Sequence, residues 1–260
     1  MPVIHPTAII HGRAVIGSGV AVGPYCVIGA DVHVADGCEF LSHVVVDGRT
    51  RIGEGCRIHS FAVVGQPPQD MKYDGEPSEL VVGARTVIRE HATLHPGTER
   101  GGMVTRVGND CLLMATTHVA HDCQIGNHVV MANNATLGGH VRVGDHAIIG
   151  GLSAVHQYVR IGPHAMIGGM SGVERDVIPY GSVMGNRAHL SGLNTVGMKR
   201  RGIGHDEIHV IRQAYRMLFE SEGTFADRLA EVAEFYTDNE RVIEIVRFIR
   251  EATQRSICTP

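Results

Sequence analysis

The stretch CLLMATTHVAHDCQIGNHVVMANNATLGGHVRVGDHAIIG, residues 111–150, carries an aliphatic residue at every sixth position. These positions are Leu113, Val119, Ile125, Met131, Leu137, Val143 and Ile149. The same period runs from Ile4 to Val64 and, after two interruptions, through 82–94 and 107–173. A period of six does not match the α-helical period of about 3.6, and the Asn-Gly and Asp-Gly turns of repeated hairpins do not recur with it. The pattern therefore predicts a solenoid of short, repeated layers.

A second rule places a small or branched residue two positions before each of these apolar residues, as at Ala135, Val141 and Ala147. Within each hexad, two alternate side chains would then point inward, as they do along a β-strand. Glycine often follows the apolar residue, and we expect it to mark a corner where the backbone turns tightly. Short strands joined by corners at a fixed spacing predict a β-helix.

The repeat resembles that of the hexapeptide-repeat family over about residues 1–185. The resemblance implies a mainly β fold, a left-handed parallel β-helix with three hexads per coil, in which residues three hexads apart in the chain stack. Neighbouring coils would then lie about 4.8 Å apart, as neighbouring strands of a sheet do. We expect this acyltransferase-type β-helix domain to span 1–187 and a small α-helical C-terminal domain to span 188–260.

Two polar interruptions, at about 66–81, with Gly and Pro, and at about 97–106, with Gly, are expected to be loops that project from the solenoid. Long loops on a rigid scaffold often carry function. Beyond about residue 187 the period of six ends, and the apolar residues follow a helical spacing. This spacing predicts helices around 208–218, over 224–236 and over 239–253.

The composition limits the class of protein. With 33 Gly, no Trp and 5% aromatic residues, the core must consist of small aliphatic layers. A formal net charge of −4 gives no general positive field, so nucleic acid is not an expected partner. Six cysteines without C-x-x-C spacing, and no secretory signal before them, favour reduced thiols in a cytoplasmic protein. No apolar run approaches the roughly 20 residues that a membrane span requires.

The segment TTHVAHD, which ends at Asp122, is the most informative about chemistry. Val119 points inward by the rule above, so His118, His121 and Asp122 are expected to face outward. His140 follows Asp122 by three hexads and should stack on it in the next coil. A neutral histidine can accept a proton from a hydroxyl near pH 7, and a neighbouring carboxylate can orient its ring. For any single histidine a solvated surface position is the alternative, and without a Ser or Cys nucleophile direct attack by an acceptor is favoured over a covalent intermediate.

Longer motifs resemble those of the UDP-N-acetylglucosamine acyltransferases that begin lipid A biosynthesis. They are QDMKYDGEP at 69–77, IREHATLHPGT at 88–98, HVAHDCQIGNHVVMANNATLGGH at 118–140, AVHQY at 154–158, GNRA at 185–188 and NTVGMKRRG at 194–202. They occur in order over almost the whole chain. The resemblance implies transfer of a 3-hydroxyacyl group from acyl carrier protein to the 3-hydroxyl of UDP-N-acetylglucosamine, with neither a cofactor nor a metal.

The same resemblance implies roles for individual residues. His121 would be the general base that removes the proton of the sugar hydroxyl, Asp122 would orient His121, and the backbone N–H of Gly139 would stabilise the oxyanion. Gly169 matches the position that limits acyl-chain length. Substrate contacts would come from Asp70, Lys72, His95, His118, His140, His156, Gln157, Asn194 and Arg201.

The resemblance also implies partners. The family assembles as a homotrimer with active sites between subunits. Since the carrier protein is acidic, basic residues near the helical unit are candidates for its docking site. They are Arg200, Arg201, Arg212 and Arg216.

One position departs from the family's pattern. Val196 stands two residues after Asn194, where the family usually has Glu, so a sugar nucleotide with a 3-amino group is an alternative acceptor. A second alternative is a zinc-dependent hydratase that resembles the γ-type carbonic anhydrases, in which histidines from neighbouring subunits hold the metal. A third is a non-catalytic binding platform, because a solenoid offers a flat, repeated surface.

Overall fold

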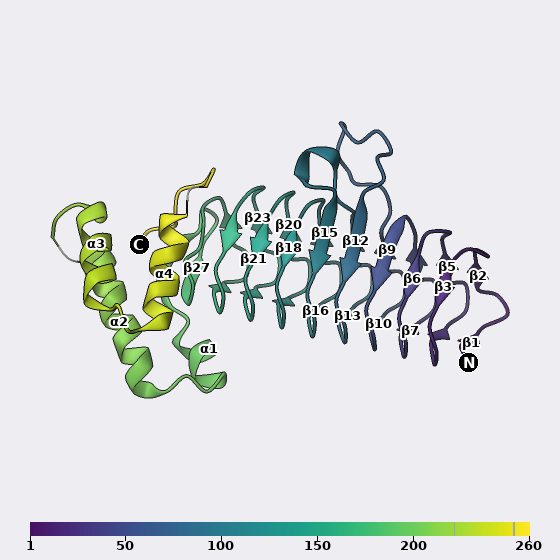
Figure 1. Ribbon diagram of the computed structural model, residues 1–260, viewed down its shortest axis with the longest axis horizontal. Helices are drawn as coiled ribbons and strands as arrows, with labels where there is room; N and C mark the ends of the chain where they lie inside the picture. The colour runs from purple at the N-terminus through teal and green to yellow at the C-terminus, as the bar shows by residue number, and fades with distance from the viewer. Residues whose placement is uncertain (221, 252) are drawn as a thin grey trace.

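The computed structural model describes residues 1–220, 222–251 and 253–260. Ser221 and Ala252, which belong to the expected helical domain, and in the case of Ala252 to the helix expected over 239–253, lie outside the described residues. The chain forms a long prism of stacked coils, with a group of helices at one end (Figure 1). Most strands are only two residues long, and they recur in three sheets that form the faces of the prism. This is the left-handed parallel β-helix with a small helical C-terminal region that the hexad pattern and the family resemblance predict.

Successive strands pass from sheet A to sheet B to sheet C and back. Sheet A holds β1 (Val3–Ile4), β4 (Ala21–Val22), β7 (Glu39–Phe40), β10 (Arg57–Ile58), β13 (Val87–Ile88), β16 (Leu112–Leu113), β19 (Val130–Met131), β22 (Ile148–Ile149), β25 (Met166–Ile167), β27 (Gly181–Met184) and β28 (His189–Leu193). Sheet B holds β2 (Ile9–Ile10), β5 (Val27–Ile28), β8 (Val45–Val46), β11 (Val63–Val64), β14 (Thr93–Leu94), β17 (His118–Val119), β20 (Thr136–Leu137), β23 (Ala154–Val155) and β26 (Gly172–Val173). Sheet C holds β3 (Val15–Ile16), β6 (His33–Val34), β9 (Arg49–Ile52), β12 (Glu79–Val82), β15 (Val104–Val107), β18 (Gln124–Ile125), β21 (Arg142–Val143) and β24 (Arg160–Ile161).

The strand register confirms the predicted stacking of residues three hexads apart. Val3 pairs with Ala21, and Val130 pairs with Ile148. Each of the two loops increases the number of residues between stacked partners in one coil. Arg49 pairs with Glu79, so the first loop lengthens its coil by the equivalent of two further hexads. Glu79 pairs with Val104, so the second loop adds slightly more than one hexad.

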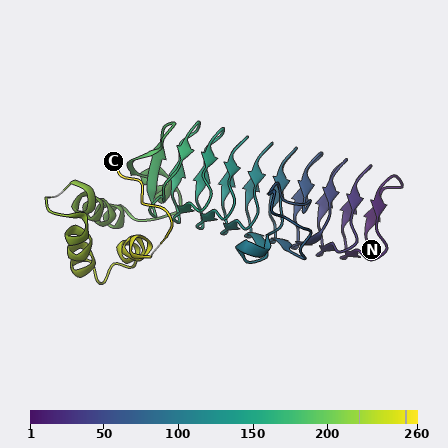
Figure 2. The same ribbon diagram turned by 90° about the horizontal axis from the view of Figure 1, so that it is seen from above.

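Both loops leave the prism at the same edge, where a strand of sheet B passes to the next strand of sheet C. We call this the B–C edge. Figures 1 and 2 show the two loops side by side on it. Each loop ends slightly earlier than the sequence indicates, because β12 starts at Glu79 and β15 at Val104. In these longer strands Leu80 and Thr105 are fully buried, so the residue two positions before the apolar residue points inward here as it does in the regular coils.

The core consists of the apolar residues of the repeat and the small residues two positions before them, as predicted. Ala135, Leu137, Val141 and Val143 are all at most 3% exposed. Five of the six cysteines occupy the position two before an apolar residue of the repeat, and all six are free and buried. They are Cys26, Cys38, Cys56, Cys111 and Cys123, with Cys258 in the C-terminal segment.

The role expected for the glycines that follow the apolar residues was wrong for the regular coils. Gly65, at the start of the first loop, has a positive φ, but Gly53 and its equivalents in regular coils do not. The tight turn comes two residues after such a glycine, as at His128, where φ is 56°. The glycines are required instead because the next coil approaches them closely. A Cβ on Gly53 would lie 2.6 Å from the backbone nitrogen of Ala84, and a side chain there would force neighbouring coils apart.

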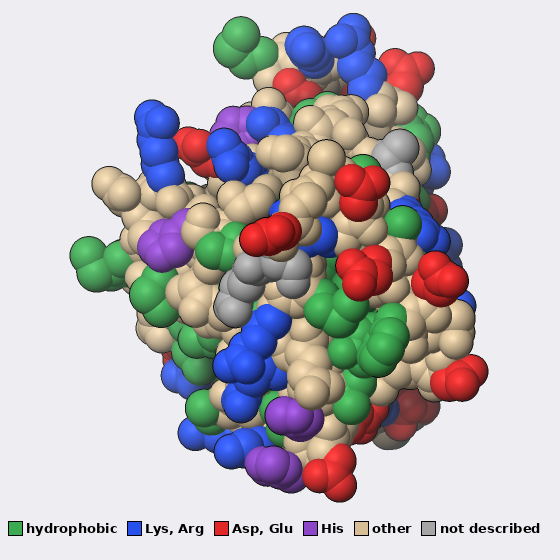
Figure 3. Space-filling view, turned by 90° about the vertical axis from the view of Figure 1, so that its left-hand side faces the viewer, with side chains coloured by type: hydrophobic (Ala, Val, Ile, Leu, Met, Phe, Trp, Pro, Cys, Tyr) green, Lys and Arg blue, Asp and Glu red, His purple; other side chains and the backbone are tan. Residues whose placement is uncertain are grey.

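After the last parallel strand pairing, the chain closes the end of the prism. The antiparallel strand β28 pairs with β27, so the first residues of the expected helical domain still belong to sheet A. In the described part of the chain, four helices follow: α1 (Thr195–Arg200), α2 (His205–Glu220), α3 (Phe225–Phe235) and α4 (Glu240–Arg250). Their outer surface carries basic and acidic side chains around a hydrophobic patch (Figure 3). Among the described residues, no helix combines the length and apolar character needed to cross a membrane.

A buried arginine fastens α4 to the prism. Arg160 is 6% exposed and donates from Nε to Asp176 Oδ2 at 2.8 Å. It also donates to Glu251 Oε2 at 2.6 Å and to the carbonyl oxygen of Phe248 at 2.9 Å. Since a buried charge is costly unless it is paired, this network fixes the helical unit on the last coils.

Replacing Gly53 with Ala should destabilise the β-helix by about 1–3 kcal/mol, since the added methyl group overlaps the backbone of the next coil. Gly12→Ala is the matched control, because nothing lies within 4 Å of a Cβ at Gly12. Equilibrium denaturation of the two variants measures the difference. Equal stability of both variants would show that the coils can separate freely at this position.

Candidate active site

The chemically distinctive side chains of the repeat lie together on the B–C edge. His121 and Asp122 follow β17, and His140 follows β20 one coil further on. Asp122 and His140 occupy equivalent turn positions, with φ of 62° and 63°. The backbone N–H of His140 donates to the carbonyl oxygen of His121 at 3.0 Å, so the turns themselves are stacked. The predicted stacking of Asp122 and His140 is thus confirmed.

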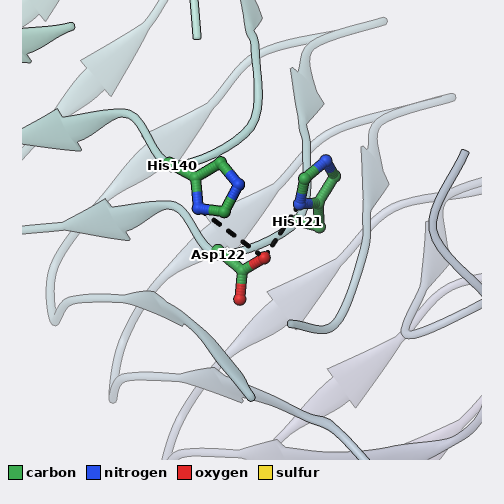
Figure 4. Close-up of side chains that lie close together, drawn as sticks. All are labelled: His121, Asp122 and His140. Atoms are coloured by element: carbon green, nitrogen blue, oxygen red, sulfur yellow. Dashed lines mark hydrogen bonds and ion pairs between the residues drawn. The ribbon is translucent and has the colours of Figure 1, made fainter. Parts of the chain in front are cut away.

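The two imidazole rings approach one carboxylate from opposite sides (Figure 4). His121 Nδ1 lies 2.8 Å from Asp122 Oδ2, and His140 Nδ1 lies 3.8 Å from the same oxygen. The ring of His121 meets that of His140 edge-on at 5.0 Å between centroids. Because the carboxylate lies within hydrogen-bonding distance of Nδ1, neutral His121 carries its proton on Nδ1 and has a free lone pair on Nε2.

Asp122 is more enclosed than the sequence indicates. Its side chain points away from the interior of the prism, but the second loop covers it, and its side-chain exposure is 0%. Thr98 of that loop donates to Asp122 twice, from its backbone N–H to Oδ1 at 3.0 Å and from Oγ1 to Oδ2 at 2.6 Å. Gly101 lies so close that a Cβ there would overlap the carboxylate. The outward direction expected for Asp122 is therefore confirmed, whereas its cover by the second loop was not predicted.

The hydrogen bonds that Asp122 accepts within this enclosure determine its charge. Burial alone would raise the pKa of this carboxyl, but hydrogen bonds from His121 and Thr98 hold the pKa below its ordinary value. Asp122 is therefore a carboxylate that accepts three hydrogen bonds, and it can stabilise a positive charge on His121. Sequence reasoning missed Thr98, although it ends the IREHATLHPGT motif, because the contact depends on how the loop folds back.

Gly139 lies directly against His121. A Cβ on Gly139 would stand 2.6 Å from the Nε2 and Cε1 atoms of the ring, so a larger residue here would displace the imidazole of His121. The carbonyl oxygen of Gly139 accepts from Tyr158 N–H at 3.0 Å. Within the described part of the chain, the N–H of Gly139 donates to no other group. A free backbone donor therefore lies beside the nitrogen that can accept a proton.

An open groove of about 550 Å³ runs past these groups. It brings together five residues predicted from the sequence: Asp70, Lys72, His121, His140 and Gln157. It also includes residues that the sequence analysis did not single out, among them Met71, Thr98, Arg100 and Tyr158. The first loop supplies one wall, and Glu76 of that loop accepts a hydrogen bond from Glu99 N–H of the second loop at 3.0 Å. The two loops thus support one another around the groove.

Two further predicted residues lie behind the groove. His118 Nδ1 is 2.7 Å from Thr93 Oγ1, and its ring meets the ring of His95 edge-on. His95 is 5% exposed, and burial lowers its pKa to about 4. Burial, together with His121, also lowers the pKa of His118. Both rings are therefore neutral at pH 7 and act as hydrogen-bonding groups rather than as cations.

Four predicted residues do not join this groove within one chain. His156 lies at its rim, where it contacts Arg255. Asn194 caps α1 and donates to the carbonyl oxygen of His164, while Arg201 donates to the carbonyl oxygen of His146. His146 and His164 lie at the edge between sheets C and A, so Asn194 and Arg201 are at a different edge from His121. Gly169 lies at the third edge, between sheets A and B, where a Cβ would meet only Gly151, at 3.3 Å from its carbonyl oxygen.

Columns of rings also occur at turns that are far from the groove. At the edge between sheets C and A, rings stack at centroid distances of 4.6–5.2 Å in the order His128, His146, His164 and Tyr180. At the edge between sheets A and B, the order is Tyr25, His43, Phe61 and His91. A column of histidines is therefore a packing feature of this fold. What distinguishes His121 is its carboxylate partner and its place in the groove.

The donor atoms of His121, Asp122 and His140 lie within 4.8 Å of one another, and among the described residues this is the group suited by type to a metal ion. Both oxygens of Asp122, however, already accept hydrogen bonds from Thr98 and His121. A metal would have to replace the hydrogen bond between His121 and Asp122. The donor set is therefore better satisfied as a proton-transfer pair than as a cation site.

Comparison with known proteins agrees with this geometry. A family model described as bacterial transferase hexapeptide repeats matches residues 105–139, and one described as UDP N-acetylglucosamine O-acyltransferase, domain 2, matches residues 176–258. A protein of Caulobacter vibrioides named acyl-acyl-carrier-protein–UDP-N-acetylglucosamine O-acyltransferase is 54% identical over 257 residues, which cover 99% of this chain and 98% of that one. A protein of Azorhizobium caulinodans with the same name is 51% identical and covers 99% and 95%.

Solved structures give the same picture. The UDP-N-acetylglucosamine acyltransferase of Campylobacter jejuni has a TM-score of 0.94 at 36% identity and covers 99% of both chains. That of Francisella novicida has a TM-score of 0.95 at 34% identity, with 99% of this chain and 94% of that chain covered. Fold and site together define a hexapeptide-repeat acyltransferase. Within that class, the chain belongs to the family of UDP-N-acetylglucosamine O-acyltransferases. The curated relatives are named as O-acyltransferases, so the amino-acceptor and carbonic anhydrase alternatives find no support among them.

Replacing Thr98 with Val should destabilise the native state by about 1–3 kcal/mol at pH 7, because a buried carboxylate loses a hydrogen bond. Since Thr98 contributes to the low pKa of Asp122, the stabilisation is present where Asp122 is charged and disappears as falling pH protonates it. The difference in the free energy of unfolding between the native chain and Thr98→Val should therefore become smaller at acidic pH. Urea denaturation over a pH series measures this, with the exposed Thr237→Val as the control; a constant difference would contradict the assignment.

Proposed function

We propose that this chain transfers a 3-hydroxyacyl group from acyl carrier protein to the 3-hydroxyl of UDP-N-acetylglucosamine, the first step of lipid A biosynthesis. The observation that carries the residue assignments is the pair of His121 and Asp122 in the groove, with Nδ1 and Oδ2 2.8 Å apart and Gly139 against the ring. Family membership and the names of the relatives support the reaction. We further propose a cytoplasmic location, where carrier protein and sugar nucleotide are available.

His121 acts as the general base. Its Nδ1–H donates to the buried Asp122 carboxylate, so Nε2 is the atom that accepts a proton. As the proton leaves the sugar 3-hydroxyl, the imidazole becomes positively charged. Asp122, which accepts three hydrogen bonds, stabilises that charge without taking up the proton itself.

The sugar oxygen then attacks the thioester carbonyl carbon directly. A new C–O bond forms, and the carbonyl oxygen becomes an oxyanion that the free N–H of Gly139 can stabilise. Collapse of this intermediate breaks the C–S bond, and protonated His121 gives its proton to the departing thiolate of the carrier protein. The products are the sugar ester and the carrier thiol, and His121 is neutral again.

The loops and neighbouring coils hold the sugar nucleotide. Lys72 and Arg100 supply positive charge for the diphosphate, and Asp70, His140 and Gln157 supply hydrogen-bonding groups along the same groove. His95 and His118 act from behind it as neutral rings. In this proposal the β-helix of 1–187 carries the chemistry, and the unit of 188–260 adds Asn194, Arg201 and the carrier docking surface around Arg200, Arg212 and Arg216.

We also propose that the active enzyme is a homotrimer with sites between subunits. Asn194 and Arg201 lie at a different edge of the prism from His121 and do not line the groove of their own chain. A site that uses both sets requires two subunits. Gly169, at the third edge, would then border the acyl chain of a site formed with a neighbouring subunit and limit its length.

Replacing His121 with Ala should lower the rate of acyl transfer by at least about 10²-fold without loss of the fold, because the base is removed. The rate is measured with radiolabelled UDP-N-acetylglucosamine and 3-hydroxyacyl carrier protein. His128→Ala is the matched control, since His128 is also a turn histidine but stacks on His146 away from the groove. Substantial remaining activity in His121→Ala, or an equal loss in His128→Ala, would contradict the proposed base.

Mixing two inactive variants tests the shared site. Chains that carry His121→Ala and chains that carry Arg201→Ala should each be inactive alone. In trimers formed by random mixing, about a quarter of the sites combine an intact His121 with an intact Arg201 of the next subunit, so about a quarter of the activity should return. If mixed trimers are demonstrated by mass spectrometry and no activity returns, His121 and Arg201 do not act across subunits.

A further inference from the structure

The C-terminal segment runs back along the prism to the edge that carries the groove. After α4 the chain passes Arg255 and forms a single parallel bridge between Ile257 and Asp176. Asp176 N–H donates to the carbonyl oxygen of Ser256 at 2.9 Å, and Cys258 N–H donates to that of Asp176 at 2.7 Å. Asp176 is fully buried. The bridge therefore holds the segment around Arg255 in one place.

Arg255 reaches from this segment to two residues that the resemblance assigns to substrate binding. Its Nη2 lies 2.7 Å from His156 Nδ1, and its Nε donates to the carbonyl oxygen of Gln157 at 3.2 Å. Gln157 lines the groove together with His121 and His140. Within the described residues, no carboxylate forms an ion pair with Arg255. The guanidinium thus directs its contacts to the coil that borders the groove.

The contact with His156 fixes the position of a proton. A guanidinium has only N–H donors, so His156 Nδ1 must be the acceptor in this bond. In the neutral ring the proton then sits on Nε2, and Nε2–H is a donor that points away from Arg255. A proton on Nδ1 could be donated to the carbonyl oxygen of Gln157 at 3.3 Å, but it would then point a donor at the Arg255 donor only 2.7 Å away, and that carbonyl oxygen already accepts from Arg255 Nε.

We infer that Arg255 is a positioning residue for the sugar nucleotide. It selects the Nε2–H tautomer of His156, which presents a hydrogen-bond donor to an oxygen of the substrate, and it holds the backbone of Gln157 at the wall of the groove. Arg255 acts through these two residues and takes no part in proton transfer. This inference rests on the proposed function for the identity of the substrate, but the tautomer itself does not depend on it.

The kinetic test compares three variants of the full-length enzyme. Arg255→Met keeps most of the side-chain length without the donors and should raise the KM for UDP-N-acetylglucosamine about tenfold, with kcat changed by less than about twofold. Arg255→Lys, which keeps a donor, should recover part of the loss. Arg250→Met is the matched control, since Arg250 is an exposed arginine at the end of α4 whose side chain forms no hydrogen bond or ion pair among the described residues, and the KM of this variant should not change.

A double variant tests whether the effect passes through His156. If it does, Arg255→Met combined with His156→Ala should have nearly the KM of His156→Ala alone, because the two changes remove one interaction. If the increase in KM of the double variant equals the product of the increases in the two single variants, the inference is overturned. An unchanged KM in Arg255→Met when His156→Ala raises it would also overturn the inference.

Ring ¹⁵N spectra of histidine-labelled enzyme provide a readout that does not depend on substrate. The His156 signal, identified by its absence in His156→Ala, should show a protonated Nε2 and an unprotonated Nδ1 in the native chain. In Arg255→Met this single tautomer should be lost. A protonated Nδ1 in the native enzyme would overturn the inference, whereas an unchanged KM in His156→Ala would remove the proposed substrate contact and leave the tautomer assignment intact.

Discussion

Backbone hydrogen bonding between successive coils determines where every other group in this protein lies. Each short strand pairs with the strand one coil away, so a residue's height along the prism and its edge follow from its place in the repeat. Close contact between coils makes this arrangement rigid, as at Gly53, where the next backbone leaves no room for a Cβ. Side chains on the edges therefore stand on a fixed frame, which is the kind of support that preorganised chemistry needs.

Chemistry arises on the one edge where the repeat is interrupted. The stacked turns bring His121, Asp122 and His140 together, yet similar turns elsewhere carry histidines that only stack on one another. The difference lies in the second loop, in which Gly101 helps to enclose the carboxylate and Thr98 keeps it charged by donating hydrogen bonds. The regular coils fix the positions of the side chains. The loops determine their burial and hydrogen bonding, and these make the pair of His121 and Asp122 reactive.

The sequence predicts the parts of this structure that depend on period alone. The hexad pattern gives a β-helix and its inward residues, and the resemblance to the hexapeptide-repeat family adds the three hexads per coil that stack Asp122 on His140. Neither of them predicts that Asp122 is enclosed, because the contact with Thr98 depends on the path of an irregular loop. The hexad pattern also places the tight turn at the wrong residue. Glycine occurs both where φ is positive and where two backbones approach closely, and the sequence does not distinguish the two cases. The contacts of Arg255 join residues that lie far apart in the chain and leave no local signal.

The extra residues of the two loops leave the prism between strands that remain in register above and below them. Length can therefore be added to this chain at an edge without disturbing the core, but a single residue gained or lost within a strand would move the inward side chains that follow it to the outside. Relatives of different length should accordingly differ by whole coils of three hexads or by loops at edges. Such a fold can change its binding loops freely while its interior stays nearly constant, so new specificities can be acquired on an old frame.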